Sequence, residues 1–189
     1  MNVTQIIKII LAIIIILFST AGIMMWRTGQ ETITPLRTLN PQSSGPRALV
    51  VYSPGLSDFH QKTAEAFAAG LAASDWSVDT VTASSQAPTD LTGYTLLVIG
   101  GPIYGGQPSK PIQDYTARLG DLKGIRVYTL LTSAGENPQA EEAMSSWVMA
   151  HGGVEAGSLM LHTQAPNTPV DGATDPAQIA AKAAQSLAK

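Results

Sequence analysis

The segment LLVIGGPIYGGQPSKPIQDY, Leu96–Tyr115, is the clearest indication of the fold. It opens with a continuous apolar run, which is typical of a strand buried on both faces of a parallel sheet. A stretch rich in glycine and proline follows, and then Ile112, Tyr115 and Leu119 recur at the spacing of one helix face. The segment therefore predicts a strand, a turn-rich loop and a helix in succession, which is the repeating unit of α/β proteins.

The same unit recurs along residues 48–189. Strands are predicted at Ala48–Ser53, Trp76–Ala83, Tyr94–Gly101, Ile125–Ser133 and Glu155–His162. Helical spacing of apolar residues follows every strand except the second, whose connection to the third, PTDLTGY, is short for a full crossover helix. This pattern predicts an α/β domain with a doubly wound, five-stranded parallel sheet of order 2-1-3-4-5.

The loops at one edge of this sheet are the candidate ligand site. In sheets of this order a ligand lies at the carboxyl ends of the strands, where the strand order reverses. The loops in question follow Ser53, Ile99 and Thr132, and they are the richest of the domain in Gly, Ser and Pro. We therefore expect a ligand to bind between them.

The first loop, SPGLSDFHQKT, Ser53–Thr63, leads into a helix whose free N–H groups and positive dipole end suit a phosphate. Ser53, Ser57 and His60 are candidate donors to the phosphate oxygens. The alternative is that Ser57 or Asp58 only caps the helix. The turn holds no Lys or Arg and lacks the G-x-x-x-x-G-K-[ST] spacing, which argues against a nucleoside triphosphate site.

The second and third loops could form two walls around a flat ligand. The glycines of GGPIYGG allow close approach of the backbone, and Tyr104 between them is either an apolar wall against a ring system or an aromatic on a surface turn. In the third loop, LTSAGENPQ, Thr132, Ser133 and Gly135 offer backbone and hydroxyl groups to a ligand edge. A plain strand-to-helix turn is the alternative explanation of that third loop.

These motifs resemble those of the flavodoxin-like family from Ala48 to the C-terminus. GGPIYGGQPSKPI is similar to the family pattern G-x-P-I-Y-x-G-x-P-S-x-x-[IV], and YSPGLSDFH is similar to Y-x-P-G-x-S-G-x-T. The resemblance implies non-covalent binding of FMN, with either electron transfer or reduction of quinones and related small molecules. The resemblance assigns the contacts with the phosphate to Ser53, Leu56 and Ser57. It assigns the contacts with the ring system to Pro102, Ile103, Tyr104, Gly105, Thr132, Ser133, Ala134 and Gly135.

Two residues of the first loop depart from the family pattern, because Asp58 replaces a Gly and His60 replaces a Thr or Ser. A carboxylate within a few ångströms of a phosphate costs about 1 kcal/mol or more. A protonated His60 would offset part of that cost through a charged hydrogen bond. The alternative to an FMN protein is therefore a domain that has lost FMN and acts as a tethered binding or regulatory module.

The N-terminal segment IIKIILAIIIILFSTAGIMMW is the strongest single signal in the sequence, since Ile9–Trp26 holds 18 residues without a charge. A helix begun at Ile6 spans about 30 Å, the thickness of a bilayer core. Trp26 and Arg27 end it as an interfacial aromatic and a charged anchor would. A permanent single-pass anchor over residues 1–27 is predicted, and a signal peptide cleaved near Ser19–Ala21 is the alternative.

Residues 28–47 are predicted to be a linker between this anchor and the domain at 48–189, because prolines and the run SSGP break any periodic pattern. Arg27 and Arg37 follow the apolar segment closely, whereas Lys8 alone precedes it. The positive-inside tendency then places the domain in the cytoplasm.

Composition and charge narrow the classes of function. The chain of 189 residues has no cysteine, which excludes disulfides, thiolate metal sites and cysteine nucleophiles. Residues 48–189 hold seven Lys or Arg against thirteen Asp or Glu, a balance that argues against nucleic acid as a partner. The sequence shows no metal-ligand spacing and no catalytic constellation. We therefore expect an FMN protein whose partners are the membrane and a redox protein or quinone.

Overall fold

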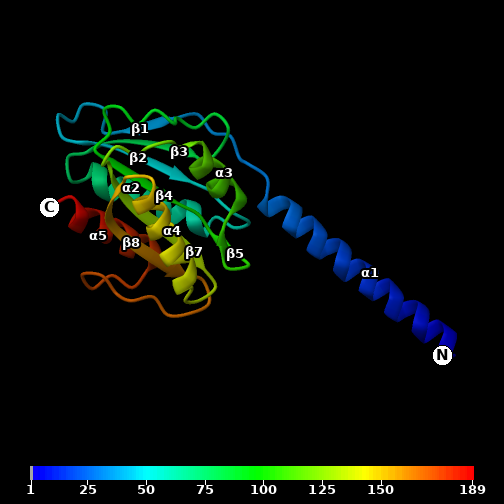
Figure 1. Ribbon diagram of the computed structural model, residues 1–189. Helices are drawn as coiled ribbons and strands as arrows, with labels where there is room; N and C mark the ends of the chain where they lie inside the picture. Colours follow the sequence, from blue (N-terminus) through cyan, green and yellow to red (C-terminus); the bar gives the residue numbers. More distant parts are fainter. Residues whose placement is uncertain (1) are drawn as a thin grey trace.

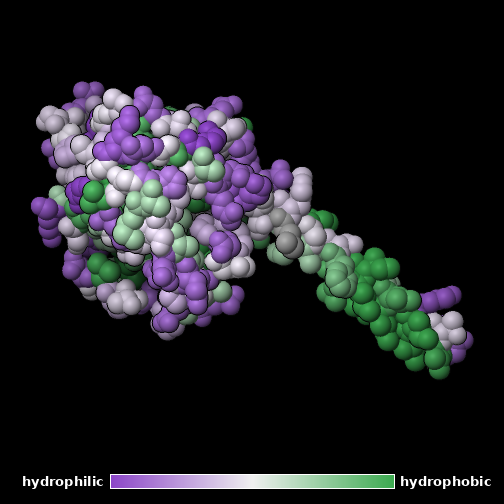
Figure 2. Space-filling model, in the orientation of Figure 1, coloured by the Kyte–Doolittle hydropathy of each residue, from purple (hydrophilic) through white to green (hydrophobic). Residues whose placement is uncertain are grey.

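A long apolar helix projects from an α/β domain in the computed structural model, which describes residues 2–189 (Figure 1). This helix, α1, spans Val3–Thr28 and begins with a capping box between Asn2 and Gln5. It is long and apolar enough to cross a membrane, although a signal sequence near the N-terminus meets the same criteria. Figure 2 shows hydrophobic residues along most of α1, whereas the visible face of the domain is largely hydrophilic.

The central sheet confirms the predicted strand order. The parallel strands lie in the order β3 (Ser77–Thr82), β2 (Arg47–Tyr52), β4 (Leu96–Gly100), β7 (Arg126–Ser133) and β8 (Val154–His162). Each begins and ends within two residues of its predicted bounds. The apolar runs form strands here because both faces of the sheet are covered, so that side chains on both faces are buried.

Helices cover the two faces in pairs. Helices α2 (Phe59–Ala72) and α5 (Pro176–Leu187) pack on the face that carries Val50 and Val98. Helices α3 (Lys110–Arg118) and α4 (Pro138–Ala150) pack on the face that carries Leu49 and Leu97. The connection between β3 and β4 contains no helix, as its shortness suggested, and its Ala87 and Leu91 pack on the α3 and α4 face.

A strand appears where a linker without regular structure was predicted. Strand β1 (Arg37–Leu39) pairs antiparallel with β3 and becomes the sixth strand and the edge of the sheet. It carries no apolar run, because only Leu39 of its three residues is partly buried, and prolines flank it on both sides. Residues 37–39 are therefore part of the sheet, and the predicted linker was wrong for that segment.

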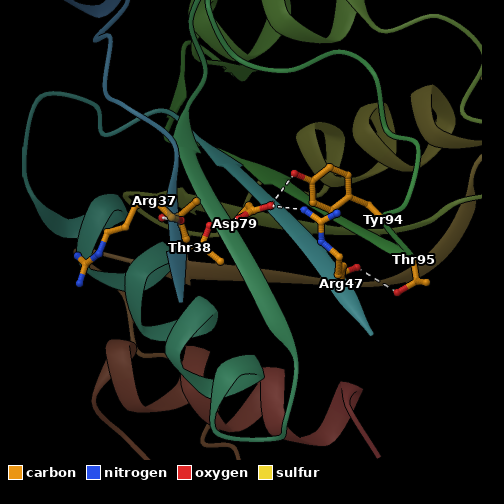
Figure 3. Close-up of polar contacts among 7 residues, drawn as sticks. Arg37, Thr38, Arg47, Asp79, Tyr94 and Thr95 are labelled. Atoms are coloured by element: carbon orange, nitrogen blue, oxygen red, sulfur yellow. Dashed lines mark hydrogen bonds and ion pairs between the residues drawn. The ribbon is translucent and has the colours of Figure 1, made fainter. Parts of the chain in front are cut away.

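A buried carboxylate ties β1 and β2 to β3 (Figure 3). Asp79 on β3 is 3% exposed and accepts hydrogen bonds from Thr38 Oγ1 (2.5 Å), Tyr94 Oη (2.7 Å) and Arg47 Nη2 (2.8 Å). The Arg47 guanidinium also lies over the Tyr94 ring, 4.7 Å from its centroid. Burial by itself would raise the pKa of Asp79, but the three hydrogen bonds and the Arg47 charge together lower it.

Replacing this carboxylate should destabilise the domain. We expect Asp79→Asn to reduce the free energy of unfolding by about 1–3 kcal/mol at pH 7, because an amide supplies fewer acceptor sites for three donors. The folded-state pKa of Asp79 is lowered, so its contribution is present at neutral pH and is lost as the pH falls through that pKa. Urea unfolding of the full chain at pH 7 and pH 3 should therefore show a smaller difference between variants in acid. Asp171→Asn, at an exposed position, is the control; equal loss in both variants would contradict the role of Asp79.

Candidate functional site

The three predicted loops meet around one cleft at the carboxyl ends of β2, β4 and β7. The cleft has a volume of about 250 Å³. Most of the predicted residues line it, together with others that were not predicted, and its lining consists of Pro54, Leu56, Ser57, Phe59, His60, Pro102, Ile103, Tyr104, Thr132, Ser133, Ala134 and Thr163. Four predicted residues, Ser53, Asp58, Gly105 and Gly135, are not part of that lining.

The first loop, residues 53–58, holds its backbone close to the second. Gly55 has φ +82°, and a Cβ there would lie 2.6 Å from Pro102 Cγ and 3.0 Å from the Tyr104 hydroxyl oxygen. The Leu56 N–H donates to the Tyr104 hydroxyl at 2.9 Å. The loop then enters α2, whose first N–H groups have no partner within the helix. Position 55 therefore needs glycine, and the Leu56 N–H is directed at the Tyr104 hydroxyl.

Asp58 does not point into the cleft. Its carboxylate pairs with Lys62 Nζ at 2.6 Å, one helical turn further on, and both side chains are exposed. The hydrogen bond and the charge of Lys62 lower the pKa of Asp58, so the residue is ionised at neutral pH and its charge is locally compensated. Its φ of −76° is ordinary, so the position does not need the glycine that the family usually has there.

His60 is buried at the base of the cleft, 1% exposed, and its Nδ1 lies 3.2 Å from Thr132 Oγ1. Burial lowers the pKa of His60 to about 3, and the Gly100 carbonyl offsets this only in part. The imidazole is therefore neutral at pH 7, and the charged hydrogen bond expected from a protonated His60 is not formed. Its Nε2 is buried without a hydrogen-bond partner among residues 2–189, which is costly unless a ligand or water completes it.

The second loop is a small β-hairpin that was not predicted. Strands β5 (Ile103–Tyr104) and β6 (Gln107–Pro108) pair antiparallel. Gly105 and Gly106 form the two-residue turn, with φ +58° and +81°, a combination that favours glycine at both positions. The hairpin projects Tyr104 over the first loop, while Gly105 lies at the exposed tip.

The third loop is ordered by its own side chains. The Ser133 hydroxyl donates to the Gly135 carbonyl, so Gly135 shapes the loop without lining the cleft. The Thr132 N–H donates to the Gly101 carbonyl at 3.2 Å, which holds the second and third loops together. Thr163, which follows β8, completes this wall. Its place after the carboxyl end of a strand was a signal that could have identified it from the sequence.

The end of α1 contributes a neighbouring cavity that was not anticipated. Its volume is about 280 Å³, and it lies between residues 26–28, 30 and 32 on one side and residues 53–56 on the other. Ser53 belongs to this cavity, and its N–H donates to the Gly100 carbonyl at 3.0 Å. Pro54 and Leu56 line both cavities, so the two adjoin across the first loop.

A larger cavity, of about 510 Å³, lies at the opposite edge of the sheet, between residues 89–95 and 119–126. It is formed by loops that precede the amino ends of β4 and β7, away from the edge at which doubly wound sheets bind ligands. Within residues 2–189 there is no group of three metal-ligating side chains that could hold a metal ion. The cleft at the carboxyl edge is therefore the candidate site.

Solved structures with the same architecture include several flavodoxins. A flavodoxin from the domain Archaea superposes with a TM-score of 0.60 at 15% identity, over 75% of this chain and 96% of that one. The two-electron reduced flavodoxin of Megasphaera elsdenii gives a TM-score of 0.59 at 18% identity, over 73% and 98%. A flavodoxin of Streptococcus pneumoniae TIGR4 gives 0.60 at 14%, over 76% and 98%. No family model and no curated protein sequence matches the chain. The domain therefore has the flavodoxin fold.

Proposed function

We propose that this chain is a single-pass membrane protein whose flavodoxin-like domain binds FMN and carries electrons to a quinone or a membrane oxidoreductase. The observation that carries the proposal is the cleft at the carboxyl edge of the sheet. There the N-terminus of α2, Tyr104 and buried His60, whose Nε2 has no hydrogen-bond partner among residues 2–189, line one space. The N-terminus of α2 suits a phosphate, and Tyr104 suits an aromatic ring system. The Nε2 atom of His60 suits a polar group at the edge of that ring system.

The residues present fit this cofactor. The N–H groups at the start of α2, with the Ser57 hydroxyl, would hold the phosphate. Tyr104 and the third loop would flank the ring system, and neutral His60 would donate or accept one hydrogen bond through Nε2. The bound FMN would supply the redox chemistry, while the protein positions the cofactor and excludes water from it.

Helix α1 serves as the anchor in this proposal. An anchored domain meets membrane-bound partners at a raised effective concentration. The basic residues after α1 favour a cytoplasmic domain, and the acidic surface of residues 48–189 suits a basic electron donor.

The proposal is tested with the full chain reconstituted into vesicles that contain a lipid-soluble quinone. After addition of FMN and chemical reduction under anaerobic conditions, reoxidation of the flavin should follow the amount of quinone in the vesicles. Vesicles without quinone are the control. Protein that takes up no FMN under these conditions would be a tethered binding or regulatory module instead.

Tyr104 provides a matched pair of variants for the cofactor site. Tyr104→Ala removes the aromatic wall and should weaken FMN binding about tenfold, since an aromatic contact contributes about 0.5–1.5 kcal/mol beyond burial. Tyr104→Phe keeps the ring and frees the Leu56 N–H, so its affinity should equal or exceed that of the natural chain. Fluorescence titration with FMN measures both. Equal weakening in the two variants would show that the ring is not a wall of the site.

A further inference from the structure

The segment between α1 and the domain is short and docked on the sheet. After Thr28, only Gly29 and Gln30 precede residues whose side chains or backbone bond to the domain. Glu31 accepts hydrogen bonds from the Ser85 N–H (2.6 Å) and hydroxyl (2.7 Å). The Thr34 N–H donates to Thr82 Oγ1 at 3.1 Å, and β1 follows directly. These contacts leave only two residues as a joint, so they restrict how the domain can move relative to α1.

This attachment lies on the same side of the domain as the cleft. Figure 1 shows α1 leaving the domain on the side where β5 lies, with the C-terminus on the opposite side. The cavity of about 280 Å³ gives the same result, because it is lined by Trp26 and Arg27 of α1 together with residues 53–56 of the first loop. The carboxyl edge of the sheet therefore faces the end of α1.

The length of α1 sets the position of the carboxyl edge of the sheet relative to the bilayer. If Ile6–Trp26 fills the hydrocarbon core, which takes about 30 Å of helix, Trp26 lies at the level of the lipid head groups. The first loop lies beside Trp26, so it reaches the same level. Exposed apolar side chains occur there, since Leu56 is 43% exposed and Ile33 is 51% exposed. Such side chains suit contact with a membrane surface.

We infer that residues 31–39 hold the domain with its ligand cleft against the bilayer, so that a molecule in the lipid head-group layer can reach the cleft and accept electrons there. This inference rests on the membrane anchor of the proposed function and adds an orientation to it. The electron acceptor that fits this orientation is a lipid-soluble quinone, because such a molecule can reach a cleft that faces the membrane from within the bilayer.

Site-directed fluorescence tests this orientation directly, because the chain has no cysteine of its own. Ile33→Cys places a fluorophore in the segment of residues 31–39, Gln107→Cys places one on the hairpin β5–β6, and Thr92→Cys places one at the opposite edge; all three positions are exposed. Each full-length variant is reconstituted into phosphatidylcholine vesicles that carry a nitroxide on the head group. Labels at 33 and 107 should be quenched at least about threefold more than the label at 92, because contact quenching vanishes beyond the reach of the side chains.

A spacer between α1 and residues 31–39 provides the control for the orienting role of that segment. A flexible Gly/Ser insert of about 20 residues between Gly29 and Gln30, with a mean span of roughly 25 Å, should remove the difference between positions 107 and 92. Equal quenching at these two positions in the chain without the insert would overturn the inference. Vesicle flotation separates it from the proposed function. A chain that floats but shows equal quenching contradicts the orientation alone, whereas a chain that does not float contradicts the anchor and the orientation together.

Discussion

FMN is expected to bind this chain at least about 100-fold more tightly than riboflavin, which lacks the phosphate. The N-terminus of α2 and the first loop offer backbone donors, and charge-assisted hydrogen bonds contribute about 1.5–3 kcal/mol each. Two such bonds correspond to about 100-fold in affinity. The expectation stands although Asp58 is close in sequence, because its carboxylate is turned to Lys62 and lies outside the cleft lining.

Fluorescence titrations of the full chain with the two flavins measure this ratio. Ser57→Asp puts an uncompensated carboxylate on the cleft wall and should weaken FMN binding while leaving riboflavin binding unchanged. Asp58→Ala is the matched control and should change both affinities by less than about threefold, since exposed charges are largely screened. Equal affinities for FMN and riboflavin would show that the first loop does not hold a phosphate.

Gly100→Ala should cost the domain more stability than any substitution discussed above, at about 3 kcal/mol or more. A Cβ at position 100 would lie 1.6 Å from the carbonyl oxygen of Leu130, so β4 and β7 would have to separate. Overpacking of a rigid core typically costs about 1–3 kcal/mol, and here the obstructing atom belongs to the backbone. The strands that position the second and third loops would move with it.

Urea unfolding of the full chain in detergent compares this variant with Gly120→Ala. A Cβ at Gly120 meets nothing within 4 Å, and that glycine does not have a positive φ. The control should therefore leave the stability unchanged or raise it by about 0.4–1 kcal/mol. Similar transition midpoints in both variants would mean that the close contact between Gly100 and Leu130 does not limit the packing.

Much of the fold is readable from the sequence, because long apolar runs have one physical explanation. Leu96–Gly100 and Leu130–Leu131 lie in strands buried on both faces, and a chain that alternates such strands with helices has few ways to cover them. Strand β1 and the hairpin β5–β6 were missed. Their strands are two or three residues long, and β1 is stabilised by pairing with residues 39 or more positions away, such as Asp79.

The site was predicted better as a place than as a set of atomic contacts. Topology brings the loops after β2, β4 and β7 together, and the sequence is sufficient for that conclusion. The direction of the Asp58 side chain was also accessible, because Lys62 follows at the i+4 spacing of a helical ion pair. The neutral state of His60 could not be predicted from the sequence, because it follows from burial of the ring. The ring lies against Thr132, which is 72 positions away, and near Tyr52 on β2.

Calorimetric titration of FMN into the flavin-free full-length chain in detergent tests whether the cleft binds this cofactor. We expect saturation at one FMN per chain, with the flavin absorbance bands shifted because the ring enters a partly apolar cleft. Riboflavin should show weaker heats at the same concentrations. Absence of binding at FMN concentrations up to about 100 μM, which corresponds to a binding free energy weaker than about −5.5 kcal/mol, would contradict the account.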